Sequence, residues 1–129
     1  MLRFLHTRIR VSDMERSIDF YRRLGFELTR RLYSPMGNKL AYMSIPGSDH
    51  EIEFCWSSDY EVRVPEDLMH TAIGVDDILE SCGRLESEGI EIWPGDWKTS
   101  LPATPADESK IAFVTDPDGY EVELIENKQ

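Results

Sequence analysis

The stretch His6-Thr-Arg-Ile-Arg-Val-Ser-Asp (residues 6–13) decides the fold, because it recurs as His70-Thr-Ala-Ile-Gly-Val-Asp-Asp (residues 70–77). The same offset of 70 − 6 = 64 residues relates three further positions, Ser17, Gly25 and Glu27, to Ser81, Gly89 and Glu91. The offset later grows to 70, where Glu51-Ile-Glu-Phe (51–54) corresponds to Glu121-Val-Glu-Leu (121–124). A repeat of this length predicts two copies of one supersecondary unit.

Each copy has the pattern of one strand, one helix and three further strands, which predicts an α+β fold of two βαβββ modules in tandem. Residues 3–11 alternate between apolar and polar side chains, as expected of a half-buried strand. Ser12 and Glu15 form a candidate capping box, and Gly25 stands where the helix would end. The helix carries an apolar stripe of Met14, Ile18, Tyr21 and Leu24. The later strands are expected at 26–32, 40–45 and 51–56 and, after a second helix from Asp77 to Gly89, at 90–93, 111–115 and 120–126.

The modules are predicted to span residues 1–62 and 68–129 of a single domain, 1–129, with the polar segment 57–67 linking them. A mass of 14.9 kDa leaves no room for a separate cofactor domain. The hairpin that closes the second module is marked by Asp-Pro-Asp-Gly at 116–119, because Pro and Gly are suited to the second and last turn positions.

The chain is strongly acidic, with 14 Lys and Arg against 25 Asp and Glu and a formal charge of −11. This charge argues against nucleic acid and membrane surfaces as partners. The N-terminus is interrupted by Arg3 and His6, so it lacks the apolar core of a signal peptide, and no stretch approaches the roughly 20 apolar residues of a membrane span. Cys55 and Cys82 fit no zinc or redox motif, so no disulfide framework is expected and the cytoplasm is the predicted location.

The repeat places a histidine on the first strand and a glutamate on the last strand of each copy, namely His6 with Glu53 and His70 with Glu123. Strand parity directs all four side chains away from the apolar face that packs on the helix. Two neutral imidazoles and two carboxylates, with a summed charge of −2, match a divalent metal ion. A single outward glutamate is ordinarily solvated and a single histidine is ordinarily not a ligand. Their retention at corresponding positions of two diverged copies favours a metal site.

Three segments resemble the glyoxalase I family, in its short bacterial type within the vicinal oxygen chelate superfamily. They are His-Thr-x-x-Arg-Val-x-Asp-x-x-x-Ser-Ile-Asp-Phe-Tyr at 6–21, His-Thr-Ala-Ile-x-Val at 70–75, and Ile-Ala-Phe-Val-x-Asp-Pro-Asp-Gly-Tyr-x-Val-Glu-Leu-Ile-Glu at 111–126. The resemblance covers essentially the whole chain. It implies a carbon–sulfur lyase of methylglyoxal detoxification that isomerises the hemithioacetal of methylglyoxal and glutathione to S-lactoylglutathione.

The resemblance also implies a homodimer with shared sites, in which His6 and Glu53 of one chain and His70 and Glu123 of the other would hold the metal. Ni²⁺ is the first choice of metal, with Co²⁺ or Zn²⁺ as alternatives. Such an ion would act as a Lewis acid while a carboxylate moves a proton between neighbouring carbons through an enediolate. Glu123 matches the family's catalytic glutamate and is the expected base, and Glu53 is expected on the opposite face of the substrate.

Arg10 shares a strand face with His6, roughly 13 Å along the strand, and matches a family position that contacts a glutathione carboxylate. Where the family commonly has an asparagine that holds glutathione, this chain has Ser57. A hydroxyl cannot replace both ends of an amide, so the thiol is left open between glutathione and another low-molecular-weight thiol. The Pro-rich segment 94–110 is expected to be either a binding loop or a loose connection. Trp93 and Trp97 border it and could cover a substrate. For Trp93, burial in the core is expected at least as strongly as a contact with substrate.

Two other functions remain open. An acyl-CoA epimerase of the methylmalonyl-CoA type would also use a metal and two carboxylates, but such enzymes usually need cationic contacts for the CoA phosphates, of which this acidic chain has few. A non-catalytic, ligand-sequestering module of the same superfamily would generally lack the metal ligands, whereas this chain keeps all four candidate residues.

Overall fold

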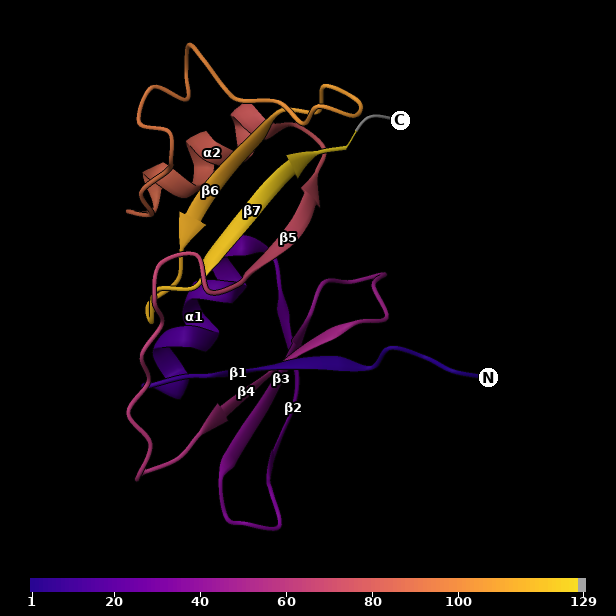
Figure 1. Ribbon diagram of the computed structural model, residues 1–129, viewed down its shortest axis with the longest axis vertical. Coiled ribbons are helices and arrows are strands. Elements are labelled where there is room, and N and C mark those ends of the chain that lie inside the picture. The colour runs from indigo at the N-terminus through magenta and orange to yellow at the C-terminus, as the bar shows by residue number, and fades with distance from the viewer. Residues whose placement is uncertain (128–129) are drawn as a thin grey trace. The chain divides into compact units, whose positions relative to one another are not determined.

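The computed structural model describes residues 1–127, and in it each copy of the repeat forms its own sheet and helix (Figure 1). The chain divides into two units, residues 1–63 and 64–129. The first unit consists of β1 (His6–Arg10), α1 (Met14–Leu24), β2 (Glu27–Tyr33), β3 (Lys39–Ser44) and β4 (Glu51–Trp56). The second consists of β5 (His70–Val75), α2 (Ile78–Ser87), β6 (Ile111–Thr115) and β7 (Glu121–Glu126). The α+β class and the repeated modules predicted from the sequence are confirmed.

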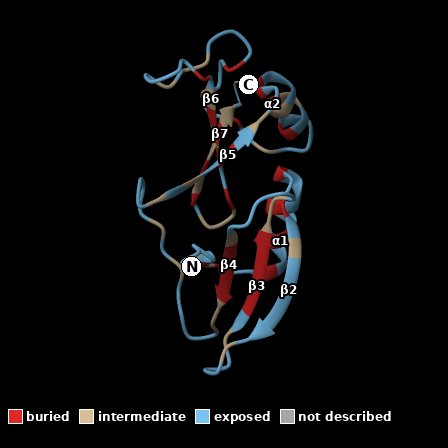
Figure 2. Ribbon diagram, turned by 90° about the vertical axis from the view of Figure 1, so that its right-hand side faces the viewer, coloured by how far each residue is buried: buried red, intermediate tan, exposed pale blue. Residues whose placement is uncertain are grey.

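The first unit is a four-stranded sheet of order β1-β4-β3-β2, with β1 parallel to β4 and the other pairs antiparallel. The core lies along β3 and β4, which Figure 2 shows buried over most of their length, whereas β2 is largely exposed. The apolar stripe of α1 is buried as expected. Its Tyr21 ring lies 5.3 Å from the ring of Phe26 and 5.1 Å from that of Phe54, measured between centroids.

The start of α1 differs from the predicted capping box. The N-cap is Asp13, in extended conformation, and its carboxylate accepts a hydrogen bond of 3.0 Å from the Arg16 backbone N–H. Glu15 instead forms a bidentate ion pair with Arg31 of β2, at 2.5 and 2.9 Å, so it is not available to bond back to the cap. The helix ends at Gly25 as predicted, where a φ of 114° favours glycine.

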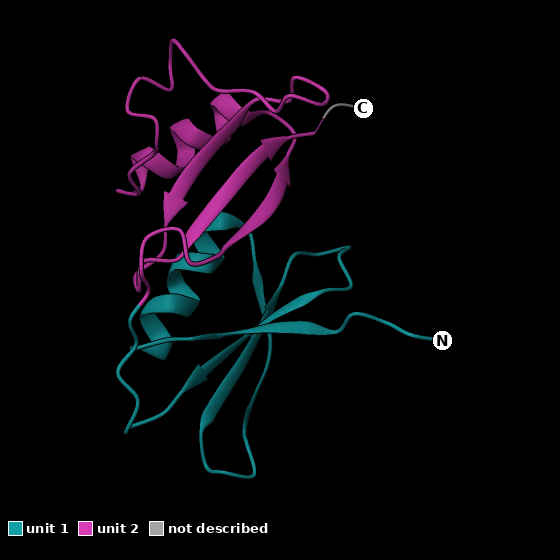
Figure 3. Ribbon diagram, viewed as in Figure 1, with its two compact units in different colours: residues 1–63 teal, residues 64–129 magenta. Residues whose placement is uncertain are grey.

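The second unit is a three-stranded sheet of order β5-β7-β6, again with the first strand parallel to the last (Figure 3). The turn at 116–119 joins β6 to β7, and the Asp116 carboxylate accepts three backbone hydrogen bonds of 2.9 to 3.0 Å there. The strand expected at 90–93 is reduced to one bridge, in which Trp93 and Phe113 exchange two backbone hydrogen bonds of 2.9 Å. Pro94 follows and has no N–H to extend the ladder.

Of the two tryptophans that were expected to be able to cover a substrate, one is buried and the other is exposed. Trp97 is 5% exposed, and its indole N–H donates to the Glu86 carboxylate of α2 at 3.0 Å. Trp93 is 60% exposed. Within the described residues, neither helix is long and apolar enough to cross a membrane.

Candidate functional site

The first candidate pair, His6 and Glu53, lies on the neighbouring strands β1 and β4. In the parallel register Arg8 is opposite Glu53, which brings His6, two residues earlier, to the same face of the sheet. The His6 Nε2 atom is 3.5 Å from Glu53 Oε2. Glu53 is 2% exposed, whereas the His6 side chain is 38% exposed and therefore accessible to a ligand.

Glu53 is held by a hydrogen-bond donor on each side. The Arg8 guanidinium donates from Nε to Oε1, and the Tyr42 hydroxyl of β3 donates to Oε2. Burial opposes the ionisation of Glu53, but the hydrogen bonds from Tyr42 and Arg8 outweigh it and hold the pKa of this carboxyl below its usual value. The hydrogen bond to Glu53, together with burial, raises the pKa of Tyr42. Glu53 is therefore an ionised carboxylate and Tyr42 a protonated phenol at neutral pH.

The second candidate pair, His70 and Glu123, has the same geometry on β5 and β7. The His70 Nε2 atom is 3.3 Å from Glu123 Oε1, and the Glu123 side chain is 14% exposed. The residues directly opposite Glu123 on the two neighbouring strands are Ala72 and Phe113, neither of which has a side-chain donor.

The separations within the pairs fit two donors on one divalent ion. Imidazole nitrogen and carboxylate oxygen bind such ions at about 2.0 to 2.2 Å, so adjacent ligands at 90° to 110° are roughly 2.8 to 3.6 Å apart. The two observed distances are 3.5 and 3.3 Å. The nitrogen, oxygen and charge of each pair suit a borderline metal of the first transition row or zinc.

Each unit brings together two of the four predicted ligands. Among residues 1–127, no group of three or more His, Cys, Asp and Glu side chains is gathered closely enough to hold an ion. A pair leaves a tetrahedral or octahedral ion with at least two coordination positions to fill. Each pair can therefore supply two of the ligands that such an ion needs.

The two predicted substrate contacts lie next to each other at the ends of β1 and β4. Arg10 donates a hydrogen bond of 2.6 Å to the Ser57 hydroxyl, and that hydroxyl donates to the Asn38 side-chain oxygen at 2.8 Å. The Arg10 guanidinium also lies 4.4 Å from the centroid of the Tyr60 ring. Asn38, before β3, was not identified from the sequence, because only the pairing of β3 with β4 brings it to Ser57.

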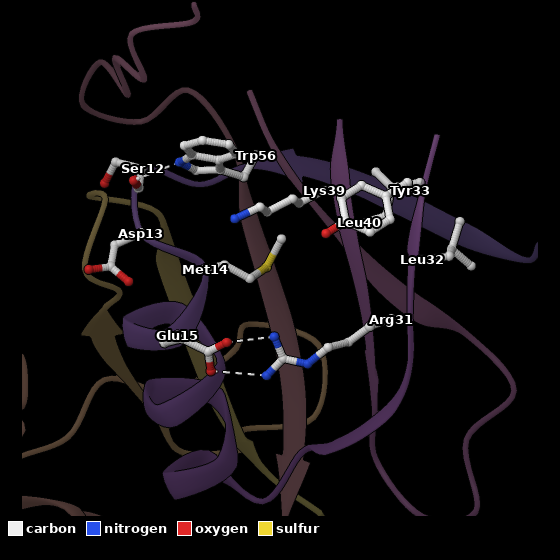
Figure 4. Close-up of a pocket in the computed structure, with 10 residues that line it drawn as sticks. All are labelled: Ser12, Asp13, Met14, Glu15, Arg31, Leu32, Tyr33, Lys39, Leu40 and Trp56. Atoms are coloured by element: carbon white, nitrogen blue, oxygen red, sulfur yellow. Dashed lines mark hydrogen bonds and ion pairs between the residues drawn. The ribbon is translucent and has the colours of Figure 1, made fainter. Parts of the chain in front are cut away.

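A groove of about 500 Å³ lies elsewhere in the first unit, at the start of α1 (Figure 4). Its walls include Met14, Trp56 and the Glu15–Arg31 ion pair, which is drawn with dashed lines in Figure 4. Trp56 is three residues after Glu53 on β4, so the two side chains leave opposite faces of the sheet. The groove is therefore on the helix-covered face and does not contain the His6–Glu53 pair.

Comparison with known proteins agrees with this architecture. Residues 3–124 match the model of the Glyoxalase/Bleomycin resistance protein/Dioxygenase superfamily. A lactoylglutathione lyase of Escherichia coli O157:H7 is 36% identical over 134 residues, covering 98% of this chain and 94% of its own length. The chain belongs to the Glyoxalase/Bleomycin resistance protein/Dioxygenase superfamily.

Comparison with solved structures also finds glyoxalase I enzymes. A glyoxalase I mutant from Zea mays aligns with a TM-score of 0.78 and 26% identity, over 98% of this chain and 46% of the maize chain. The trypanothione-dependent glyoxalase I of Leishmania major aligns with a TM-score of 0.70 and 31% identity, over 98% and 87% of the two chains.

Proposed function

We propose that this protein is a lactoylglutathione lyase, which isomerises the hemithioacetal of methylglyoxal and glutathione to S-lactoylglutathione. The observation that carries the proposal is the pair of repeat-related His–Glu contacts, His6 with Glu53 and His70 with Glu123. The likeness to the E. coli enzyme along 98% of the chain supports the same reaction.

We assign His6, Glu53, His70 and Glu123 as the ligands of one divalent ion, with Ni²⁺ as the first choice and Co²⁺ or Zn²⁺ as alternatives. When bound, such an ion supplies Lewis-acid stabilisation of negative charge on the two substrate oxygens. The donor set supports this assignment, because two neutral imidazoles and two carboxylates balance the charge of a divalent cation.

Glu123 is the proposed base. Its carboxylate takes the proton from the carbon that bears sulfur and hydroxyl, and the proton returns to the neighbouring carbon. The hydroxyl proton passes to the neighbouring oxygen, so the isomerisation neither adds nor removes atoms. Lacking side-chain donors at the positions opposite it, Glu123 is less constrained than Glu53. Glu53, on the opposite face of the substrate, is held ionised by Arg8 and Tyr42.

Arg10 and Ser57 are the proposed contacts for the thiol, joined by Asn38. Together they present a guanidinium, a hydroxyl and an amide, which suit a carboxylate such as those of glutathione. Asn38 supplies an amide close to the position where Ser57 replaces the family asparagine. The glyoxalase I of Leishmania major is trypanothione-dependent, so the thiol of this chain has to be tested.

We further propose a homodimer in which the His6–Glu53 pair of one chain and the His70–Glu123 pair of the other complete one site. This arrangement is supported by the two donors that each unit contains and by the parallel pairing of the first and last strands in both units. The units then act as modules of one domain, 1–129. Both cysteines are buried and unpaired in the described chain, which suits the reducing cytoplasm that we assign.

The test is an activity matrix on protein stripped of metal and reloaded with Ni²⁺, Co²⁺ or Zn²⁺. Each form is given methylglyoxal with glutathione, trypanothione or another low-molecular-weight thiol, and thioester formation is followed by ultraviolet absorbance. We expect turnover in at least one metal form with glutathione. Metal uptake without thioester from any thiol would refute the lyase assignment, and no stoichiometric metal uptake would favour a sequestering module instead.

A further inference from the structure

The two candidate glutamates have corresponding positions but different neighbours. Glu53 is flanked in the sheet by Arg8 and Tyr42, and both donate hydrogen bonds to its carboxylate. Glu123 is flanked at the matching positions by Ala72 and Phe113, which cannot donate. We call the Glu53 carboxylate clamped, because its cross-strand neighbours donate to it, and the Glu123 carboxylate unclamped, because its cross-strand neighbours cannot.

Tyr42 contacts both members of the first pair. Its hydroxyl donates to Glu53 Oε2, the oxygen nearest His6, and its ring meets the His6 ring edge-on at a centroid distance of 5.5 Å. Phe113 meets His70 in the same way, at 6.2 Å and an interplanar angle of 83°, but has no hydroxyl. The aromatic contact with histidine is therefore common to both units, and only the hydrogen bond to the glutamate is specific to Tyr42.

Tyr42 is itself held firmly. It is 6% exposed, and the Arg30 guanidinium covers its ring at 3.8 Å from the centroid. Arg30 in turn donates two hydrogen bonds, of 2.9 and 3.2 Å, to Glu51. A buried ring held by Arg30 and by its contact with His6 loses little further freedom when its hydroxyl orients a carboxylate.

We propose that Tyr42 and Arg8 are positioning residues that hold the Glu53 carboxylate with one oxygen directed toward His6, so that the first unit presents a preformed half of the metal site. Arg8 occupies Oε1, which leaves Oε2 as the oxygen shared between Tyr42 and a metal. A carboxylate oxygen has two lone pairs, so it can accept the phenol hydrogen and bind an ion together. The inference rests on the proposed metal role of His6 and Glu53.

The test measures Co²⁺ affinity of the full chain by competition with a chromophoric chelator, and records the visible absorption of bound Co²⁺. Outer-shell partners of metal ligands typically contribute about 10- to 100-fold to metal affinity. We expect Tyr42→Phe to weaken Co²⁺ binding about 10-fold and to alter the Co²⁺ spectrum, and Arg8→Met to weaken binding less, since Arg8 is 46% exposed. The matched control is Tyr33→Phe, which removes a phenol from the exposed strand β2 and should change neither readout.

Circular dichroism and thermal unfolding establish that each variant is folded, and Tyr42→Phe keeps the ring and its volume. Unchanged Co²⁺ affinity in Tyr42→Phe and in the Tyr42→Phe/Arg8→Met double variant would overturn the proposal. Tighter Co²⁺ binding in Arg8→Met would show that Arg8 competes with the metal for Glu53, and would overturn the positioning role of Arg8. The ratio of variant to wild-type affinity is independent of turnover, so wild type that binds Co²⁺ without making thioester refutes the lyase assignment alone. Wild type that binds none of Ni²⁺, Co²⁺ and Zn²⁺ refutes both.

Discussion

Mixing two inactive variants tests whether the active site is shared between chains. Each unit holds one His–Glu pair, so the proposed dimer has two sites, each built from the first unit of one chain and the second unit of the other. We predict that His6→Ala and His70→Ala are each inactive alone but regain activity together. In a mixed dimer, one site lacks both histidines and the other retains both. Because random exchange makes about half of the dimers mixed and half of their sites intact, about one quarter of wild-type activity per chain should return.

The assay is the initial rate of thioester formation after the two variants have exchanged subunits, with exchange verified by native mass spectrometry. The matched control mixes His6→Ala with Glu53→Gln, which both damage the first unit. Every site in that mixed dimer lacks one of the two residues, so no activity should return. No recovery in the first mixture after verified exchange, or equal recovery in the control, would refute the shared site.

Three further predictions concern the thiol of α2, the substrate contact and the core. Burial, aided by the Glu86 carboxylate, raises the pKa of Cys82 to about 11, whereas the unfolded thiol titrates near 9. The folded state therefore holds this proton more tightly, so the contribution of Cys82 to the free energy of unfolding is complete below pH 9 and falls by roughly 2 to 3 kcal/mol as the pH rises to 11. Urea unfolding should show this fall in wild type, and an equal fall in Cys82→Ala would contradict the prediction. Arg10→Gln should raise KM for the hemithioacetal about 10-fold or more with little change in kcat, because a charge-assisted hydrogen bond contributes about 1.5 to 3 kcal/mol; steady-state rates that show a loss in kcat alone would exclude a binding role. Tyr21→Ala should lower the free energy of unfolding by about 3 to 5 kcal/mol, since the ring is 1% exposed among Phe26 and Phe54; a loss below 1 kcal/mol in urea unfolding would show that the site collapses around the deletion.

Most of the fold could be predicted from hydrophobic period and from the repeat. The strands at 51–56 and 111–115 begin and end where predicted, and those expected at 26–32, 40–45 and 120–126 shift by at most one residue at either end. The first strand was expected at 3–11 and is shorter, because it begins three residues later, at His6, and ends at Arg10. Periodicity could not show that Glu15 bonds to Arg31, because that contact depends on how α1 packs beside β2. It also could not separate Trp97 from Trp93, since burial on α2 depends on the path of the irregular segment between them.

The candidate site could be predicted only in part, for a related reason. Strand parity and the repeat identified the two His–Glu pairs, whose members the structure brings within 3.5 and 3.3 Å. The residues that surround them depend on strand register, which the sequence leaves open. Tyr42 is an ordinary strand residue until β3 is set opposite Glu53, and Asn38 is an ordinary loop residue until it lies beside Ser57.

The divergence of the two units indicates how an acidic chain could accept an anionic thiol. On β1 the residues that share a face are His6, Arg8 and Arg10, and the corresponding residues of β5 are His70, Ala72 and Gly74. The histidine is kept in both units, and the two guanidiniums are confined to the first. Arg8 pairs with Glu53, and Arg10, which donates to the Ser57 hydroxyl, is the guanidinium that we propose for a substrate carboxylate. The first unit would then bind the charged end of the thiol, and the second unit, with its unclamped Glu123, would move the proton. Because charges far from the substrate carboxylate are screened, the net charge of −11 would not oppose its binding beside Arg10.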